Sequence, residues 1–217
     1  MKNIELEIDL RPLMACGLFA LREDGAPALG GVRCYFEEGA LMFVATDRKA
    51  LLAVRLKHAE ARPADAITIP LSVLDMATNY VGRLFTLDIT PAQADGLRMV
   101  GLWTGAKEMV FAGPEPEGKF PDRWREVLPL GDLRPSCPPV SLWLLRRIAD
   151  AADILGMSPA VRLFSRDADE SKVHYAALDP DGGSHFDVVC AVMPMRGGVL
   201  SGSDTITVPA WAYGGAE

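Results

Sequence analysis

The residue types that most often carry chemistry are sparse in this sequence and lie far apart. They are His58, His174, His185, Cys16, Cys34, Cys137 and Cys190. None of them has the spacing of metal ligands, and no CxxC pair occurs. We expect surface or edge-strand histidines, and cysteines that are reduced and mostly buried.

An acidic loop at 179–187, DPDGGSHFD, comes nearest to a metal site. Asp179, Asp181 and Asp187 supply carboxylates, which Ca²⁺ prefers, but the loop lacks the third early ligand and the closing Glu of an EF-hand. We interpret it as a hairpin turn rich in Asp and Gly. The sequence also has no GxSxG, P-loop, GxGxxG or HExxH motif. It therefore predicts a protein that is not an enzyme and has no cofactor or metal, with an active site of scattered residues as a remote alternative.

The stretch CAVMPMR at 190–196 is unusual for a strand. Proline removes a ladder donor, so Pro194 predicts a sheet edge or the point where the chain leaves the sheet. Methionine is adaptable and is common on surfaces that accept several partners. An apolar strand that simply ends at the sheet boundary, or methionines that fill a junction between two domains, are the alternative interpretations.

Composition indicates a globular chain with a substantial core. The 217 residues are 49% hydrophobic, and the formal net charge is -7, which argues against nucleic-acid binding by a strongly basic surface. This charge is still compatible with a ring-shaped protein that encircles nucleic acid, because such a ring can be acidic outside and mildly basic inside. No apolar run approaches the roughly 18 residues of a membrane span, and the N-terminus is too acidic for a signal peptide, so we expect a cytoplasmic protein.

Hydrophobic periodicity predicts an α+β fold. Helices are expected at 10–22, 71–80 and 141–156, the last with Ser141 able to cap it and Gly156 ending it. Strands are expected at 32–37, 40–46, 51–56, 66–70, 84–90, 97–103, 107–112, 160–165, 173–178 and 186–193, the first two joined as a hairpin at 37–39.

The chain divides at a segment rich in proline. We predict one domain at 1–115, an extended linker at 116–139 and a shortened second domain at 140–217. A weak internal repeat relates DAITIPLSVL (65–74) to DTITVPAWAY (204–213). We infer a repeated unit of one helix and several strands, with the helices on one face of antiparallel sheets.

Three stretches, in this order, resemble the bacterial DNA polymerase III beta subunit, the sliding clamp. They are LMFVATDRKALLAV (41–54), EGKFPDRWREVLP (117–129) and VMPMR (192–196). The resemblance covers roughly residues 10–196 and implies a DNA clamp-like fold. These residues are similar to the family's middle domain and to part of its last domain. The family carries three similar domains per chain and closes a ring of six as a dimer, whereas this chain has about two. Arg48-Lys49-Ala50 replaces the family's usual Gly-His-Arg, and 197–217 continue past the motif that ends those chains.

The resemblance implies a groove between the two domains, where polymerases and repair proteins dock short peptides. Its residues would be Leu29, Thr46, Leu51, Pro121, Val127, Met193, Pro194, Met195 and Arg196. It also implies helices that face duplex DNA and contact phosphates without reading sequence. The cations for that role would be Arg11, Arg83, Arg146 and Arg147, although the last two could instead belong to a solvated, salt-bridged helix face with Asp150 and Asp153.

The leading hypothesis is a compact clamp-like processivity factor. It would form a homo-oligomer, be loaded by an ATP-driven clamp loader, and tether a polymerase or other partners to duplex DNA. The rival hypothesis is a non-encircling adaptor or decoy that keeps the peptide groove and has lost the ring.

Overall fold

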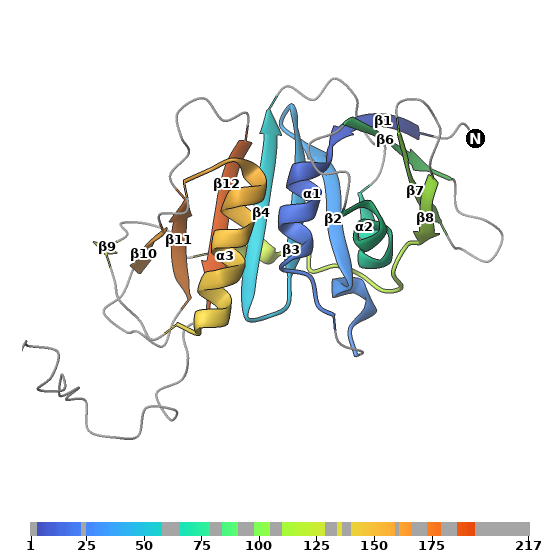
Figure 1. Ribbon diagram of the computed structural model, residues 1–217. Coiled ribbons are helices and arrows are strands. Elements are labelled where there is room, and N and C mark those ends of the chain that lie inside the picture. Colours follow the sequence, from blue (N-terminus) through green and yellow to red (C-terminus); the bar gives the residue numbers. More distant parts are fainter. Residues whose placement is uncertain are drawn as a thin grey trace, which may run out of the picture.

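The structure is a computed structural model. It describes residues 4–22, 25–57, 66–78, 84–90, 98–104, 110–128, 134–135, 140–158, 161–165, 173–178 and 186–193. These residues form three α-helices and two antiparallel sheets (Figure 1). No helix among them is long and apolar enough to cross a membrane.

The helices are α1 (Leu10–Gly17), α2 (Leu71–Ala77) and α3 (Leu142–Leu155). The smaller sheet has the order β1 (Ile4–Asp9), β6 (Leu84–Ile89), β7 (Met99–Thr104) and β8 (Val110–Pro114). The larger sheet has the order β5 (Ile67–Pro70), β2 (Gly31–Glu37), β3 (Ala40–Thr46), β4 (Ala50–Lys57), β12 (Phe186–Val192), β11 (His174–Leu178), β10 (Val161–Ser165) and β9 (Arg134–Pro135). Two short 3₁₀ turns, η1 (Pro27–Leu29) and η3 (Trp124–Val127), complete the described elements.

The inferred unit of one helix and several strands is present as a strand, a helix and three further strands, whereas 204–213, the second segment of the sequence repeat, lies outside the described residues. The unit occurs as β1-α1-β2-β3-β4, again as β5-α2-β6-β7-β8, and a third time as β9-α3-β10-β11-β12. In the first two copies the leading strand joins the other copy's sheet, because β1 pairs with β6 and β5 with β2. This exchange holds the two copies together as one unit.

The larger sheet continues across the Pro-rich linker. Strand β12 pairs antiparallel with β4, from Phe186 opposite Leu56 to Val192 opposite Ala50. The strand order is symmetric about this pair, and α1 and α3 lie side by side on one face of the sheet (Figure 1). The β4–β12 pair, called the seam below, therefore joins the two halves of the chain through backbone hydrogen bonds.

Both faces of the larger sheet are covered. Alternate side chains of β3 and β4, such as Phe43 and Leu52, pack with α1 and α3, while the intervening ones, such as Val44 and Leu51, pack against linker residues. This alternation follows from the two-residue period of a strand. Because both faces are buried, these strands read as nearly continuous apolar runs.

The structure differs from the sequence prediction in several local details. Helix α1 ends at Gly17 rather than at 22, because the chain turns so that the Leu21 N–H donates to the Leu29 carbonyl. Ser141 stands before α3 without a side-chain capping bond, whereas Gly156 ends that helix in the left-handed conformation as expected. His174 is fully buried on β11 rather than at an edge or on the surface.

Other predictions on chemistry-bearing residues are confirmed in part. Cys16, Cys34 and Cys190 are free and buried. Strands β11 and β12 pair antiparallel as the hairpin interpretation requires, although the turn at 179–185 lies outside the described residues. His58, His185 and Cys137 also fall outside them.

Candidate functional site

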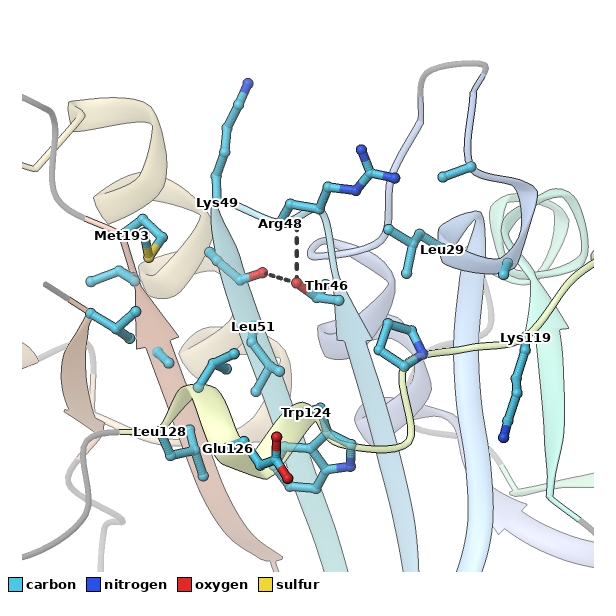
Figure 2. A pocket seen from close by; sticks show the side chains of 18 of the residues that line it. Leu29, Thr46, Arg48, Lys49, Leu51, Lys119, Trp124, Glu126, Leu128 and Met193 are labelled. Carbon is cyan, nitrogen blue, oxygen red and sulfur yellow. Dashed lines mark hydrogen bonds between the residues drawn. The ribbon is translucent and has the colours of Figure 1, made fainter.

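A groove of about 1010 Å³ lies at the seam, on the sheet face covered by the linker (Figure 2). Its floor comes from the ends of β4 and β12, and its walls come from η1, the linker and the turn between β3 and β4. The residues that line it are Ala26, Ala28, Leu29, Thr46, Arg48, Lys49, Ala50, Leu51, Lys119, Pro121, Trp124, Glu126, Val127, Leu128, Ser165, Val173, Ala191, Val192 and Met193.

The linker wall is anchored to the sheet by aromatic residues. Phe120 and Trp124 are almost fully buried against β3, β4 and β12. The Trp124 indole N–H donates to the Tyr35 hydroxyl at 3.2 Å, and Arg125 donates to the same hydroxyl and to Glu37. Burial raises the pKa of Tyr35, so its hydroxyl stays protonated at neutral pH. These contacts fix the linker as a wall of the groove.

The opposite wall is the turn from Thr46 to Ala50. The Thr46 hydroxyl donates to the Ala50 carbonyl at 2.8 Å and accepts from the Arg48 N–H at 3.1 Å (Figure 2). Asp47 Oδ1 accepts from the backbone N–H groups of Lys49 and Ala50, at 2.9 and 2.8 Å. Arg48 has a φ of 71°, a conformation that non-glycine residues seldom adopt. The surrounding hydrogen bonds hold this strained turn in a single shape.

Arg147 supports the turn from the far side of the sheet. Its guanidinium lies 2.6 Å from Asp47 Oδ2, and both side chains are less than 10% exposed. The same guanidinium lies over the rings of Phe19 and Trp143, 4.7 and 4.4 Å from their centroids. Arg147 therefore joins α3 to the turn. This burial corrects the expectation that its guanidinium lies on a DNA-facing surface.

The other predicted DNA-facing cations differ in their surroundings. Arg11 donates to Asp9 through Nε and Nη2 and lies over the Phe186 ring. Arg146 is 81% exposed and lies 3.8 Å from Asp150, the spacing proposed for a solvated helix face. Arg83 falls outside the described residues.

The structure brings most of the predicted groove residues together. Leu29, Thr46, Leu51, Pro121, Val127 and Met193 all line the same groove. Pro194, Met195 and Arg196 lie outside the described residues. The Met193 N–H donates to the Lys49 carbonyl at 2.8 Å, which ties the end of β12 to the β3–β4 turn. Peptide docking at this groove stays a prediction.

Sequence reasoning missed several lining residues. Trp124 forms part of the WREV segment that was assigned to the linker, and its large apolar ring was the available signal. Arg48 and Lys49 were noted only as departures from the family's turn. Ser165 and Val173 carry no sequence signal, because only the strand order brings β10 and β11 to the groove.

The groove is lined mainly by apolar side chains. Its floor is apolar, and its charged lining residues, Arg48, Lys49, Lys119 and Glu126, are exposed to solvent. Among the residues the structure describes, no cluster of His, Cys, Asp or Glu could hold a metal ion. An extended peptide with apolar side chains is the kind of occupant that such a surface accepts.

No model of a protein family matches the sequence, and no curated protein matches it either. Solved structures do match. The DNA polymerase III subunit beta of Pseudomonas aeruginosa has 19% identity and a TM-score of 0.63, over 89% of this chain and 66% of that one. The sliding clamps of Bacillus subtilis (15% identity, TM-score 0.63, 90% and 64% covered) and Caulobacter crescentus (16%, 0.64, 89% and 66%) match similarly. The chain has the sliding-clamp fold and spans slightly less than two thirds of the length of those clamps.

Proposed function

We propose that this chain is a sliding-clamp-like processivity factor, which tethers DNA polymerase or another partner to duplex DNA by docking a partner peptide in the groove. The observation that carries the proposal is that motifs far apart in the sequence line one apolar groove at the seam of a clamp fold. The proposal assigns the chain no catalysis and a place in the cytoplasm.

The groove supports the peptide half of the proposal. Leu51 and Ala191 give an apolar floor on neighbouring strands, and Trp124 and Pro121 give a wall with little freedom to move. A peptide that places one or two large apolar side chains into this space removes them from water, at about 25 cal/mol per Å² of apolar area. Met193, at 41% exposed, is flexible enough to pack against different anchors.

The DNA half of the proposal rests on the fold. A closed ring holds duplex DNA through its topology, so that few phosphate contacts are needed. The proposed assembly is a homo-oligomer that an ATP-driven clamp loader opens and closes around DNA. Light scattering coupled to size exclusion tests the assembly, and a strict monomer at high concentration would contradict it.

A non-encircling adaptor or decoy is the second candidate. It is favoured by the burial of Arg147, which pairs with Asp47 and leaves one predicted DNA-facing cation unable to reach a phosphate. Retention on circular compared with linear DNA separates the two, because only a closed ring is held longer on DNA without ends.

Fluorescence anisotropy with a labelled peptide of the Gln-Leu-x-Leu-Phe type tests the groove. Met193→Asp places a charge at the edge of the apolar floor. A bound peptide would remove this carboxylate from water, and a cost of about 1.4 kcal/mol is enough to weaken binding about tenfold, so we expect at least that loss. Met76→Asp is the matched control, since Met76 is 46% exposed on α2, outside the groove. Equal binding by both variants, or no binding by the wild type, would overturn the groove assignment.

A further inference from the structure

The outer edge of strand β10 is only partly paired. On one side β10 pairs with β11 along most of its length, whereas on the other side β9 reaches only Phe164 and Ser165 (Figure 1). Among the residues that the structure describes, no strand lies beside Val161, Arg162 and Leu163 on that side. Their outward backbone groups form an open sheet edge, to which another strand can add.

The first copy of the repeat shows how such an edge is completed. Strand β2 follows α1 as β10 follows α3, and β5 pairs along β2 from Gly31 to Cys34. Val32 and Cys34 are fully buried there, at 0% exposed. In β10, Val161 and Leu163 pack against the same core but are only partly buried. A strand in the position of β5 is what β10 lacks.

The sequence repeats both members of this strand pair. GVRCYF (31–36), in β2, is similar to AVRLF (160–164), and DAITIPLSVL (65–74), which contains β5, is similar to DTITVPAWAY (204–213). The register of β2 with β5, carried over to the second pair, sets Val161 opposite Val208, Arg162 opposite Thr207 and Leu163 opposite Ile206. These three residues of β10 are the ones whose edge is open.

A polar contact of the first copy has its counterpart in the second pair. Arg33 on β2 donates to the Thr68 hydroxyl on β5, at 3.3 Å. At the matching positions, Arg162 is exposed on β10, and Thr207 is the polar residue between two apolar ones. A hydrogen bond between Arg162 and Thr207 would repeat the cross-strand contact.

The apolar residues of the segment have the spacing of a covering strand. Ile67 and Ile69 of β5 are both fully buried. Ile206 and Val208 are likewise two residues apart, so they share one face of a strand. In the register given above they lie on the face of the sheet that packs toward α3, where β10 leaves its apolar side chains partly exposed.

The segment can reach this edge from the end of β12. Strands β10 and β12 point the same way, because each is antiparallel to β11. A strand antiparallel to β10 therefore starts at the end of the sheet where β12 finishes. Neighbouring strands lie about 4.8 Å apart, so three steps across the sheet cover about 14 Å. The residues between Met193 and Ile206 span up to about 45 Å when extended.

We propose that residues 204–209 add to the larger sheet as a strand antiparallel to β10, in the place that β5 has beside β2. The docking surface is the open edge of β10 with its partly buried Val161 and Leu163. The occupant comes from the same chain, because a short connection keeps the segment at a high effective concentration near its own β10. This inference does not depend on peptide docking in the groove.

Disulfide formation in the full-length chain tests the register. Arg162→Cys with Thr207→Cys places two thiols directly opposite each other, at a Cα separation that a disulfide allows. Arg162→Cys with Thr205→Cys is the matched control, because Thr205 lies on the same side of the segment but two residues out of register. Both variants also carry Cys137→Ser, and their remaining cysteines are buried.

The opposed pair should form an intrachain disulfide at least about tenfold faster than the control pair, because only the opposed thiols are held together. Mass spectrometry of the digested protein after mild oxidation measures both rates. Adding Ile206→Asp and Val208→Asp to the opposed pair should remove the advantage, since docking would bury two charges.

Hydrogen exchange of β10 gives a second measurement that needs no added cysteine. The amides at the open edge should exchange at least about tenfold faster in Ile206→Asp with Val208→Asp than in the wild type. Thr207→Asp is the matched control, because its carboxylate would lie opposite Arg162 and should leave the protection unchanged.

The proposal fails if the two cysteine pairs oxidise at equal rates, because the segment then has no fixed place at β10. A disulfide that joins two chains, seen as a dimer on a non-reducing gel, would assign the open edge to another chain. Equal hydrogen exchange in the wild type and in Ile206→Asp with Val208→Asp would show that no strand of this segment covers the edge.

Discussion

Replacing Arg147 by methionine removes the charge that holds the β3–β4 turn to α3 and keeps a side chain of similar length. The turn carries Thr46 and Arg48 on the groove, so the substitution acts on the groove from the opposite side of the sheet. We expect Arg147→Met to destabilise the fold and to weaken peptide binding at the same time.

The magnitude follows from the contacts of the pair. Asp47 keeps the two N–H groups at Oδ1 but loses the guanidinium at Oδ2, and breaking a buried pair in this way costs about 3–5 kcal/mol. Methionine still packs on Phe19 and Trp143 and recovers about 0.3–1.5 kcal/mol through sulfur–aromatic contact. The expected loss of unfolding free energy is therefore about 3 kcal/mol.

Urea unfolding followed by circular dichroism measures this loss. Arg146→Met is the control, since Arg146 is the neighbouring residue on α3 and is 81% exposed, and it should change stability by no more than about 0.5 kcal/mol. Asp47→Asn completes a double-mutant cycle with Arg147→Met, in which we expect a coupling of about 2 kcal/mol. Equal, small losses for Arg146→Met and Arg147→Met would refute the supporting role of the buried pair.

Two further predictions concern stability. Gly156→Ala should lower the free energy of unfolding by about 1 kcal/mol. Gly156 has a φ of 68°, and an added Cβ would meet no atom within 4 Å, so the loss comes from backbone strain alone. An unchanged stability in urea unfolding would contradict the left-handed helix end. Burial raises the pKa of Cys34 and Cys190 to about 12, above the ordinary value of 9.0. The stability that these two protonated thiols contribute is therefore fully present below pH 9. Between pH 9 and 12 the free energy of unfolding falls by up to about 1.4 kcal/mol per pH unit for each thiol. A Cys34→Ala, Cys190→Ala variant should lose stability less steeply over that range, and equal slopes would contradict this.

The groove could be largely predicted because its residues lie in short motifs. Ala45-Thr46-Asp47 and the Phe-Pro-Asp of the linker each fix a local conformation, and the resemblance says which motifs meet. Local sequence did not show that Trp124 helps to anchor the linker wall, because its partner Tyr35 comes from a distant strand.

Two features were missed although a signal was present. In β1, the apolar residues Ile4, Leu6 and Ile8 alternate with acidic residues, which is the pattern of a strand. In the sequence analysis, this segment was tested only as a possible signal peptide. Arg147 lies between Leu144 and Ala151 on the buried stripe of α3, so the period of 3.6 already places it inward. Its partner Asp47 is far away in sequence, and only the seam brings the two together.

The seam has a consequence for synthesis of the chain on the ribosome. Strand β4 is made early and exposes an apolar edge, with unpaired backbone groups, until β12 is made after all the strands from β5 to β11. A bare apolar edge is a template for pairing with other chains. Nascent chains that end before β12 are therefore expected to be the aggregation-prone species of this protein, and a chaperone that covers β4 should raise its folding yield.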